Sequence, residues 1–339
     1  MYIIIGASSF IGVYTARYFI DKGEDLIVTG RNNKFCQYYK QFPNVKYINL
    51  DLNNPNDFDQ LPTEGVEGLA LISAMLPASE DADLDENENA DKYIKVNTLG
   101  TINVLEYCRR NKIKRVISTV SYGDISESLG CGHAITEEEP RNFKFSGDHA
   151  AYVISKNAAA DIMEYYNQQH DMKNAWFRLP PVYGVGPHGS LKVNGKLVKS
   201  GLQIFIDKAS EGEPIEVFGD GKLYRDVVYV KDVAKAFYRA FKSERTYGLY
   251  NISSGVKITL LEQAQVCAEV FATDSEHKSL VQTRPEIANK GISYQLSIEK
   301  ANKDFDYYPE FAEFKAMMID WKDELYEGSM TKLFSGREA

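Results

Sequence analysis

The first twelve residues constrain the fold more than any other stretch of this chain. Residues 2–12 run Tyr-Ile-Ile-Ile-Gly-Ala-Ser-Ser-Phe-Ile-Gly, an apolar run followed by small residues. A short apolar run that ends at a glycine is typical of a parallel strand covered on both faces. A strand that enters a helix through small residues directs unpaired backbone N–H groups and the positive end of the helix dipole to one point. The stretch therefore predicts an anion site that suits the pyrophosphate of a dinucleotide.

The turn within this stretch has a glycine pattern with one departure. Gly6 and Gly12 take the first and last positions of a Gly-x-x-Gly-x-x-Gly turn, and Ser9 takes the middle one. A middle glycine lets the backbone approach phosphates closely, whereas Ser9 adds a hydroxymethyl group that either donates to a phosphate oxygen or crowds it. The alternative is a strand–helix connection whose small residues serve packing alone. The turn residues that we predict to contact the cofactor are Gly6, Ser8, Ser9, Phe10, Ile11 and Gly12.

Charge and composition exclude several classes of protein. The net charge of −9 argues against a nucleic-acid partner, and much of the negative charge falls between residues 80 and 91, where we expect a solvated loop. No apolar run approaches the roughly 20 residues of a membrane span, so we expect a cytoplasmic protein without a membrane partner. The four cysteines lack metal or redox spacing and are expected to be free thiols, and no metal site is predicted, with His133 and His149 both expected in loops.

Short apolar runs alternate with helical patterns through the first half of the chain. The predicted strands are residues 2–5, 26–29, 45–49, 69–72, 115–120 and 175–179. A helix over residues 91–110 is expected to bury Ile94, Thr98, Thr101, Ile102, Leu105 and Cys108, and a second long helix contains residues 157–168. This alternation predicts an α/β fold, a Rossmann-type doubly wound parallel sheet with right-handed crossovers.

The residues at the end of the second strand bear on the choice of cofactor. In dinucleotide folds an acidic residue there holds the ribose 2′-hydroxyl, whereas an arginine accommodates a 2′-phosphate. The strand ends Thr29-Gly30-Arg31, and Asp25 precedes the strand rather than following it. The cofactor is therefore expected to be NAD(P), with a preference for NADP(H), although an arginine after a strand is also common without any function.

Tyr152 and Lys156 are the residues that we expect to carry the chemistry. Residues four apart on a helix lie on one face. A tyrosine hydroxyl, with a pKa of about 10, is a poor base at neutral pH, but a neighbouring ammonium stabilises its phenolate. The pair then acts as a proton shuttle. Because a Tyr-x-x-x-Lys spacing also occurs by chance, the alternative is an exposed pair on an amphipathic helix.

With these motifs in place, the chain resembles the extended short-chain dehydrogenase/reductase superfamily, specifically the NAD-dependent epimerase/dehydratase family that modifies nucleotide sugars. The segments that carry the resemblance are residues 2–12, 51–52, 97–101, 114–117, 152–156, 178–184, 212–221, 225–232 and 297–309. The resemblance implies cofactor contacts at Arg31, Asp51, Leu52, Ala74, Asn97 and Lys156, and substrate contacts at Phe218, Arg225 and Arg284. Pro181 stands where many relatives have an asparagine, and Pro181 cannot donate to a diphosphate.

The resemblance also implies a serine or threonine that completes the catalytic group. Counting forward along the strand from Arg115 gives Ser121, whereas counting back from residues 122–123 gives Ser118. We prefer Ser121 because the sheet fixes the length of a strand, while loops absorb gaps. No Asp-Glu pair follows, so the dehydratase reaction is not expected.

Together these inferences predict two domains and one class of reaction. A nucleotide-binding domain spans residues 1–180 and 225–254, and a smaller C-terminal α/β substrate domain spans 181–224 and 255–339. The resemblance implies an epimerase acting on a nucleotide-diphosphate sugar, assembled as a homodimer through the helices near 91–110 and 152–168. One alternative is an NADPH-dependent nucleotide-4-ketosugar reductase, and another is a non-catalytic NADP-sensing protein on the same fold. Thr259 with Glu262 predicts a capping box, and Asp232 an N-cap.

Overall fold

A computed structural model describes residues 1–33, 35–77, 90–147, 149–187, 189–193, 196–274, 276–326 and 328–335. The predicted acidic loop, apart from Asp91, lies outside these residues.

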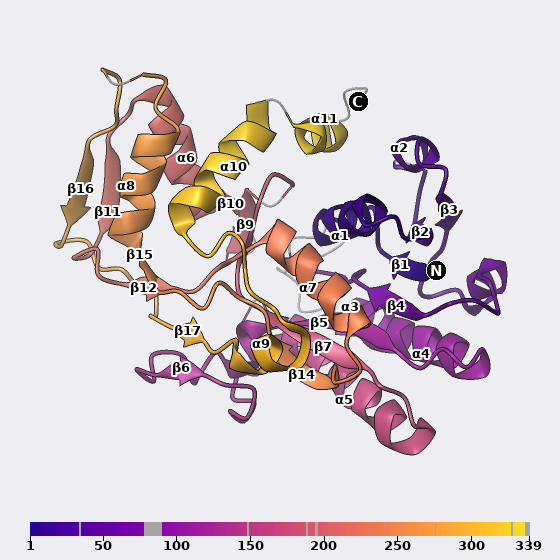
Figure 1. Ribbon diagram of the computed structural model, residues 1–339. Helices are drawn as coiled ribbons and strands as arrows, with labels where there is room; N and C mark the ends of the chain where they lie inside the picture. The colour runs from indigo at the N-terminus through magenta and orange to yellow at the C-terminus, as the bar shows by residue number, and fades with distance from the viewer. Residues whose placement is uncertain are drawn as a thin grey trace.

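The centre of the protein is one parallel sheet of seven strands (Figure 1). Its strands, from one edge to the other, are β3 (Val45–Asn49), β2 (Leu26–Gly30), β1 (Tyr2–Ile5), β4 (Gly68–Leu71), β5 (Val116–Ser121), β7 (Ala175–Leu179) and β14 (Gly248–Asn251). Every neighbouring pair is parallel. The predicted Rossmann-type fold is confirmed, and all six predicted strands are present. The strand order reverses between β1 and β4, which is where doubly wound sheets bind ligands.

Helices cover both faces of this sheet. On one face α1 (Phe10–Asp21) and α7 (Val230–Lys242) lie side by side over a core that contains Ile4, Val28 and Ile117 (Figure 1). On the other face α4 (Gly100–Arg110) and α5 (Ala150–His170) cover Ile3, Ile5 and Leu69. The short helices α2 (Cys36–Lys40) and η1 (Pro55–Gln60) flank β3. Both faces of the central strands are buried, as their continuous apolar sequences predict.

The predicted helix over 91–110 contains a π-helical segment that rotates its buried face. It runs as α3 (Ala90–Tyr93), a π-helix η2 (Ile94–Leu99) and then α4. The extra residue per turn leaves Ile94 and Ile102 only partly buried and Leu99 49% exposed, while Asn97 becomes buried. The prediction of a regular apolar stripe was therefore wrong at Ile94 and Ile102, because the helix does not keep a 3.6-residue period.

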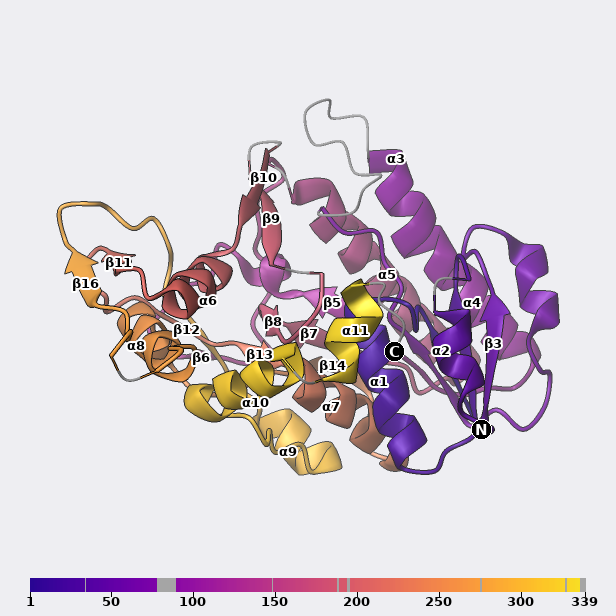
Figure 2. The same cartoon turned by 90° about the horizontal axis from the view of Figure 1, so that it is seen from above.

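A second lobe stands at the opposite end of the molecule from β3 (Figure 2). It contains α6 (Gly201–Glu211), β11 (Ile215–Phe218), α8 (Leu260–Val270), β16 (Val281–Arg284) and α10 (Phe314–Tyr326) around its own apolar core. Short strand pairs join the lobe to the sheet domain or extend from it: β8 (Val182–Tyr183) with β13 (Val228–Tyr229), β12 (Tyr224–Arg225) with β15 (Ile258–Thr259), β6 (Ala134–Ile135) with β17 (Gln295–Leu296), and β9 (Ser190–Val193) with β10 (Lys196–Lys199).

The end of the chain packs differently from the predicted division at residue 255. Helices α9 (Glu299–Phe305) and α11 (Ser329–Ser335) bury Phe305, Met330 and Leu333 in the same core as α1. The ring of Phe334 lies 6.5 Å from that of Phe10 and 6.0 Å from that of Phe35. Residues 255–339 therefore pack in both cores: α8 and α10 lie in the core of the second lobe, and α9 and α11 in the core of the sheet domain.

The two predicted caps have different outcomes. At α8 the capping box is confirmed, with Thr259 and Glu262 each accepting from the other's backbone N–H. Asp232 is not an N-cap, because α7 begins two residues earlier, at Val230. Its carboxylate instead accepts from the backbone N–H groups of Glu310 at 2.7 Å and Phe311 at 3.0 Å, and so joins α7 to the segment before α10.

Candidate active site

The glycine turn forms a cradle at the carboxyl end of β1. Gly6 has a φ of 91°, and a Cβ there would lie 2.5 Å from the backbone nitrogen of Ser73, which follows β4. A Cβ on Gly12 would overlap the carbonyl oxygen of Gly6. Ser9 caps α1, because its hydroxyl donates to the Gly6 carbonyl at 2.7 Å and accepts from the Gly12 N–H at 3.2 Å. The Ser9 proton is therefore engaged within the turn, which removes the expectation that it donates to a phosphate.

Tyr152 and Lys156 lie near the start of α5 on its buried side. Lys156 is 4% exposed, and among the described residues its ammonium has no hydrogen-bond or ion-pair partner. Burial lowers the pKa of Lys156 to about 8 and raises the pKa of Tyr152 above its usual value. The Tyr152 ring lies 6.2 Å from the ring of Tyr93 and in the same cluster as Met75, which follows β4. The loop after β4 thus reaches from the glycine turn to Tyr152.

The two candidate serines occupy different positions on β5. Ser118 is 4% exposed and donates to the carbonyl of Leu71 at 3.0 Å, inside the sheet. Ser121 is the last residue of β5, at the carboxyl edge. Its hydroxyl oxygen accepts from the Gly123 N–H at 3.0 Å, and no described residue accepts its proton. A Cβ on Gly123 would lie 2.8 Å from the Val153 side chain, so the Ser121 turn rests against α5.

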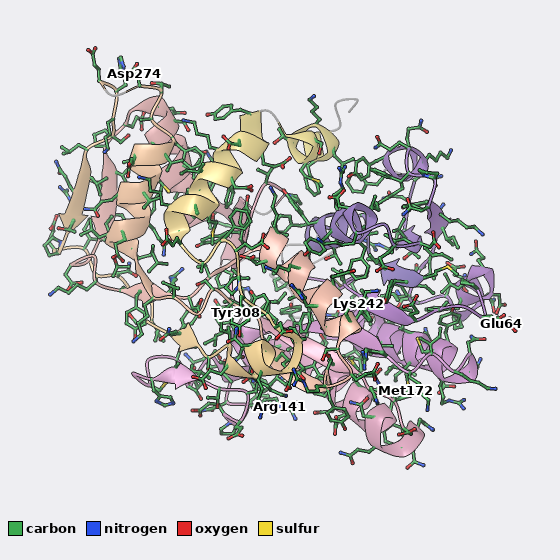
Figure 3. The ribbon with its side chains drawn as sticks, viewed as in Figure 1. Glu64, Arg141, Met172, Lys242, Asp274 and Tyr308 are labelled. Carbon is green, nitrogen blue, oxygen red and sulfur yellow. The ribbon has the colours of Figure 1, made fainter. Side chains whose placement is uncertain are left out.

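A buried ion pair beneath this turn was missed by the sequence analysis. Arg178 on β7 is fully buried, and its guanidinium binds the carboxylate of Asp124 through Nε at 3.0 Å and through an Nη atom at 2.8 Å. Asp124 belongs to the short helix η3 (Tyr122–Ile125) that begins directly after Ser121. Burial raises the pKa of Asp124 against the opposing effect of Arg178. The loop before α5 is held separately by Arg141 (labelled in Figure 3), whose guanidinium pairs with the carboxylate of Asp161 at 2.8 Å.

Comparison with protein families then identifies the chain. The model of the NAD dependent epimerase/dehydratase family matches residues 2–253. The chain belongs to this family. A putative UDP-glucose 4-epimerase of Methanocaldococcus jannaschii is 26% identical over 274 residues, covering 77% of this chain and 79% of that protein. UDP-glucuronic acid decarboxylase 1 of Arabidopsis thaliana is 24% identical, covering 91% of this chain and 66% of that protein. The solved UDP-glucose 4-epimerase of Thermotoga maritima superposes with a TM-score of 0.72 at 20% identity, covering 96% and 100% of the two chains.

In this member of the epimerase/dehydratase family, Asn97 holds two parts of the site together. Its side-chain amide accepts from the Met75 N–H at 2.7 Å and donates to the Met75 carbonyl at 3.1 Å and to the Ser155 hydroxyl at 2.9 Å. Asn97 is buried, and these contacts use both of its donor hydrogens. The prediction of a direct cofactor contact is therefore not supported by this geometry, in which Asn97 positions the loop after β4 against α5.

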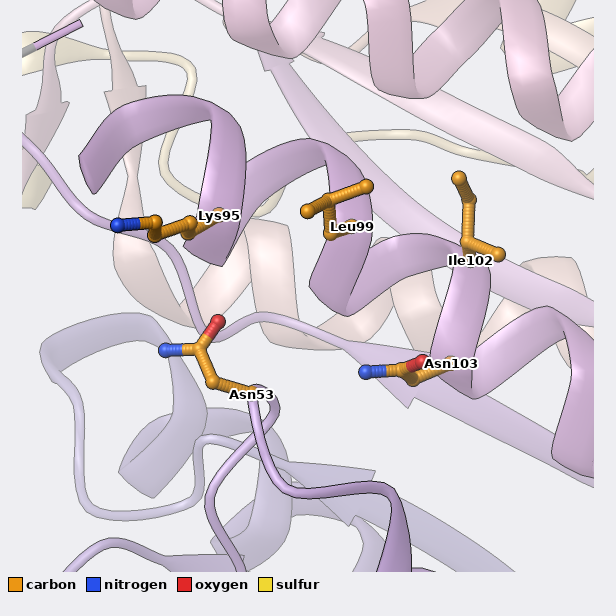
Figure 4. Close-up of a pocket in the computed structure, with 5 residues that line it drawn as sticks. All are labelled: Asn53, Lys95, Leu99, Ile102 and Asn103. Atoms are coloured by element: carbon orange, nitrogen blue, oxygen red, sulfur yellow. The ribbon is translucent and has the colours of Figure 1, made fainter. Parts of the chain in front are cut away.

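Asp51 and Leu52, two of the predicted cofactor contacts, lie just beyond β3. Asp51 is exposed and accepts from the Asn53 N–H at 2.9 Å, whereas Leu52 is buried and its carbonyl accepts from Asn103 at 2.7 Å. Ala74, partly buried, follows Ser73 in the loop after β4, and Arg31 is exposed directly after β2. A pocket of about 400 Å³ adjoins this region on the outer side of η2 and α4 (Figure 4). Its lining residues are Asn53, Lys95, Leu99, Ile102 and Asn103.

Arg225 lies in an aromatic cluster beside the Ser121 turn. The rings of Tyr122 and Tyr294 stack at 5.3 Å, and Tyr294 is 4% exposed. The Tyr294 hydroxyl is buried and has no partner among the described residues. Burial raises the pKa of Tyr183 to about 12, and the positive charge of Arg225 opposes that rise. Arg225 and Tyr122, which follows Ser121, thus both lie within electrostatic range of Tyr183 and Tyr294.

Phe218 and Arg284 are farther out in the second lobe, as neighbours in the β11–β16 pair. Phe218 is 47% exposed. Arg284 lies 3.0 Å from a carboxylate oxygen of Glu286 and 3.6 Å from one of Glu216. Its charge is already opposed by two carboxylates, which makes Arg284 a weaker candidate for an anion ligand than Arg225.

The remaining predictions concern metals, thiols and membranes. His133 pairs with Glu139 at 2.8 Å, and the described residues contain no group of His, Cys, Asp and Glu suited to a metal. All four cysteines are free, as predicted. None of the helices in the described part of the chain has the length and apolar character of a bilayer-spanning segment.

The buried carboxyl group of Asp226 is expected to make the stability of the protein depend on pH. Its carboxylate accepts from the hydroxyls of Ser253 and Ser254 and from the Leu296 N–H, and burial raises its pKa to about 6. In an unfolded chain the pKa is about 4. Between these values the folded protein keeps a proton that the unfolded chain has released, so this group's contribution to stability falls as pH rises from about 4 to about 6. We expect the wild type to lose about 2–3 kcal/mol over this range relative to Asp226→Asn.

Urea unfolding of both proteins at a series of pH values measures this difference. Comparing the two curves removes the contributions of all other carboxylates, including Asp232, whose pKa burial also raises to about 6. Parallel curves for wild type and variant would contradict the prediction.

Proposed function

We propose that this chain is a nicotinamide-dinucleotide-dependent enzyme that acts on a nucleotide-diphosphate sugar, and that it is an epimerase. The observation that carries the proposal is Lys156, one helical turn after Tyr152: its side chain is 4% exposed, and its ammonium has no hydrogen-bond or ion-pair partner among the described residues. A buried ammonium without hydrogen bonds is unfavourable. Ribose hydroxyls of a bound dinucleotide would satisfy it, and this supports a cofactor at the carboxyl edge of the sheet.

The residues of the cradle fit such a cofactor. A Cβ at Gly6 or Gly12 would meet the Ser73 backbone or the Gly6 carbonyl, so the two glycines let the turn fold tightly and α1 begin soon after β1, with its first N–H groups at the carboxyl end of the strand. Several similar solved structures are complexes with NAD, among them that of a UDP-glucuronic acid 4-epimerase of Bacillus cereus. When bound, the nicotinamide supplies the hydride acceptor and donor. Arg31 supports a preference for NADP over NAD.

Tyr152, Lys156 and Ser121 divide the proton chemistry between them. The Oη atom of Tyr152 takes the proton of a sugar hydroxyl while the carbon that bears this hydroxyl is oxidised to a ketone. We propose that the Lys156 ammonium favours the phenolate form of Tyr152 that this step requires, against burial, which raises the pKa of Tyr152. The Ser121 hydroxyl, whose proton no described residue accepts, donates to the same sugar oxygen. After the keto sugar turns over, return of the hydride to its other face, together with the proton from Tyr152, gives the epimer.

Substrate binding is assigned to the second lobe. Arg225, beside the Ser121 turn, is proposed to bind the diphosphate, since a guanidinium meets phosphate oxygens with two parallel hydrogen bonds. Phe218, exposed at the end of β11, is proposed to lie against the base, and Arg284 to assist at its rim. The names of similar proteins include UDP-sugar epimerases, which supports a UDP-sugar as the first substrate to test.

Product analysis separates the epimerase from its nearest rival. The purified protein is incubated with UDP-glucose, UDP-N-acetylglucosamine or UDP-glucuronic acid, and the products are identified by proton NMR. An epimerase forms an equilibrium mixture of two epimers without net consumption of NADPH. A 4-ketosugar reductase, which Arg31 also favours, consumes one NADPH for each 4-ketosugar reduced. Absence of both activities on these sugars and on 4-keto derivatives would contradict the proposal.

We further propose that the protein is a homodimer that associates through the outer faces of α4 and α5. Leu99 of η2 is 49% exposed, and on α5 Ile154 and Tyr165 are 37% and 53% exposed. Apolar side chains on two adjacent helices support a surface that a second copy covers. Light scattering coupled to gel filtration measures the mass, and a value near the 38.3 kDa of one chain would contradict this assembly.

A further inference from the structure

The carboxyl end of β2 carries a glycine, Gly30, although its backbone conformation does not require one. Gly30 is the last residue of β2 and does not have the positive φ that glycines adopt elsewhere in this chain. The space above it is what excludes a side chain. A Cβ on Gly30 would overlap the phenol oxygen of Tyr47 and would lie 2.7 Å from the hydroxyl oxygen of Ser8. Tyr47 therefore occupies the volume into which a side chain at position 30 would extend.

Tyr47 is held in this place from two sides. On the edge strand β3 its ring stacks on that of Tyr39 at 5.9 Å, and Tyr39 in turn donates to the carbonyl of Ala7 in the glycine turn at 2.6 Å. The Tyr47 hydroxyl donates to the carbonyl of Asn32, one residue after Arg31. A chain of contacts thus links the glycine turn, through two tyrosines, to the backbone beside Arg31.

The same strand makes a second bond to the loop after β2. Asn49, two residues after Tyr47 and on the same face of β3, donates to the side-chain oxygen of Asn33 at 3.0 Å. A pocket of about 300 Å³ adjoins the loop, and none of its lining residues carries a carboxylate. Those residues are Asn33, Cys36, Lys46, Tyr47, Ile48, Asn49 and Gln60. Amides and an ammonium, without an acid, favour an anionic group beside this loop.

We propose that Tyr47 determines cofactor specificity at this site. Its phenol excludes an acidic side chain from the end of β2, where such a side chain would hold a ribose 2′-hydroxyl, and it fixes the backbone next to Arg31. The site then accepts a dinucleotide with a 2′-phosphate and disfavours one without it. This inference rests on the proposed function, because it assumes that the cradle at Gly6 holds a dinucleotide.

Two fragments of the cofactor test this end of the site alone. Isothermal titration calorimetry on the full chain measures the affinities of adenosine 2′,5′-bisphosphate and of 5′-AMP. The wild type is expected to bind the bisphosphate about tenfold or more tightly than 5′-AMP, because the 2′-phosphate gains charge-assisted hydrogen bonds. Tyr47→Phe keeps the ring on Tyr39 but loses the bond to Asn32, and the ratio is expected to fall by about threefold or more.

Substitutions at Gly30 test whether the Tyr47 phenol excludes a side chain from the end of β2. Gly30→Asp alone is expected to weaken both fragments by about tenfold, since its carboxylate meets the Tyr47 phenol. Gly30→Asp combined with Tyr47→Phe is expected to recover part of the 5′-AMP binding, since Ser8 still crowds the new Cβ, and to reverse the preference. Tyr107→Phe is the matched control. It removes another phenol-to-carbonyl bond, from Tyr107 of α4 to Pro62, and is expected to leave the ratio unchanged. Circular dichroism and melting temperatures confirm that each variant is folded.

The outcomes separate this inference from the proposed function. Neither fragment carries a nicotinamide or the sugar group of a nucleotide-sugar substrate, so the ratio is independent of catalysis. A wild-type ratio of one or less overturns the inference, as does an unchanged ratio in Tyr47→Phe. If the ratio behaves as expected while no nucleotide sugar is converted, the proposed reaction fails and the specificity assignment stands.

Discussion

Tyr152→Phe is expected to lower kcat by about a thousandfold, since general acid–base catalysis typically contributes factors of this size. The substitution removes only the hydroxyl. The ring remains packed against Tyr93 and Met75, so melting temperature and dinucleotide affinity should match the wild type. The turnover measured is that of the nucleotide sugar identified by product analysis, together with calorimetric titration of the dinucleotide.

Tyr165→Phe is the matched control for this experiment. Tyr165 lies on the same helix and is 53% exposed, so removal of its hydroxyl should leave kcat unchanged. Wild-type turnover in Tyr152→Phe would refute the assigned chemistry. If the wild type converts no sugar and Tyr152→Phe still binds the dinucleotide normally, the result would instead favour the non-catalytic sensing protein.

The parts of the site that the sequence predicted are those in which the residues lie close together along the chain. Gly6 and Gly12 lie six residues apart and Tyr152 and Lys156 four apart, and each spacing is set by a single turn or helix. The strand count from Arg115 gave Ser121, and the structure supports it because Ser121 lies at the carboxyl edge, whereas Ser118 donates to Leu71 inside the sheet.

The parts that the sequence did not predict depend on contacts between distant segments. Asp124 and Arg178 are 54 residues apart, and nothing near either one indicates its partner. The π-helical segment around Asn97 has no periodic signature, and the bonds that Asn97 makes join it to Met75 and Ser155, which are 22 and 58 residues away in the sequence. The sequence did not indicate that α9 and α11 pack in the same core as α1, because an apolar helix face is compatible with either core.

The Asp124–Arg178 pair gives the largest expected effect on stability. Asp124→Leu leaves a guanidinium that is fully buried without its carboxylate, and breaking a buried pair in this way typically costs about 3–5 kcal/mol. Asn251 still accepts from Arg178 at 3.1 Å, but a neutral amide oxygen does not replace the lost charge. Urea unfolding monitored by circular dichroism measures the loss.

The double variant Asp124→Leu with Arg178→Met separates the cost of an unpaired charge from the value of the pair. Because replacing both partners by apolar residues of similar volume is often close to neutral, we expect the double variant to regain most of the stability that Asp124→Leu loses. Its kcat should nevertheless stay below that of the wild type, since η3 no longer bonds to β7 and the Ser121 turn loses its anchor.

Asp161→Ala, which removes the exposed pair with Arg141, is the control and should change stability by no more than about 1 kcal/mol. Equal destabilisation of the single and double variants would mean that packing around η3, and not the unpaired guanidinium, holds the turn in place.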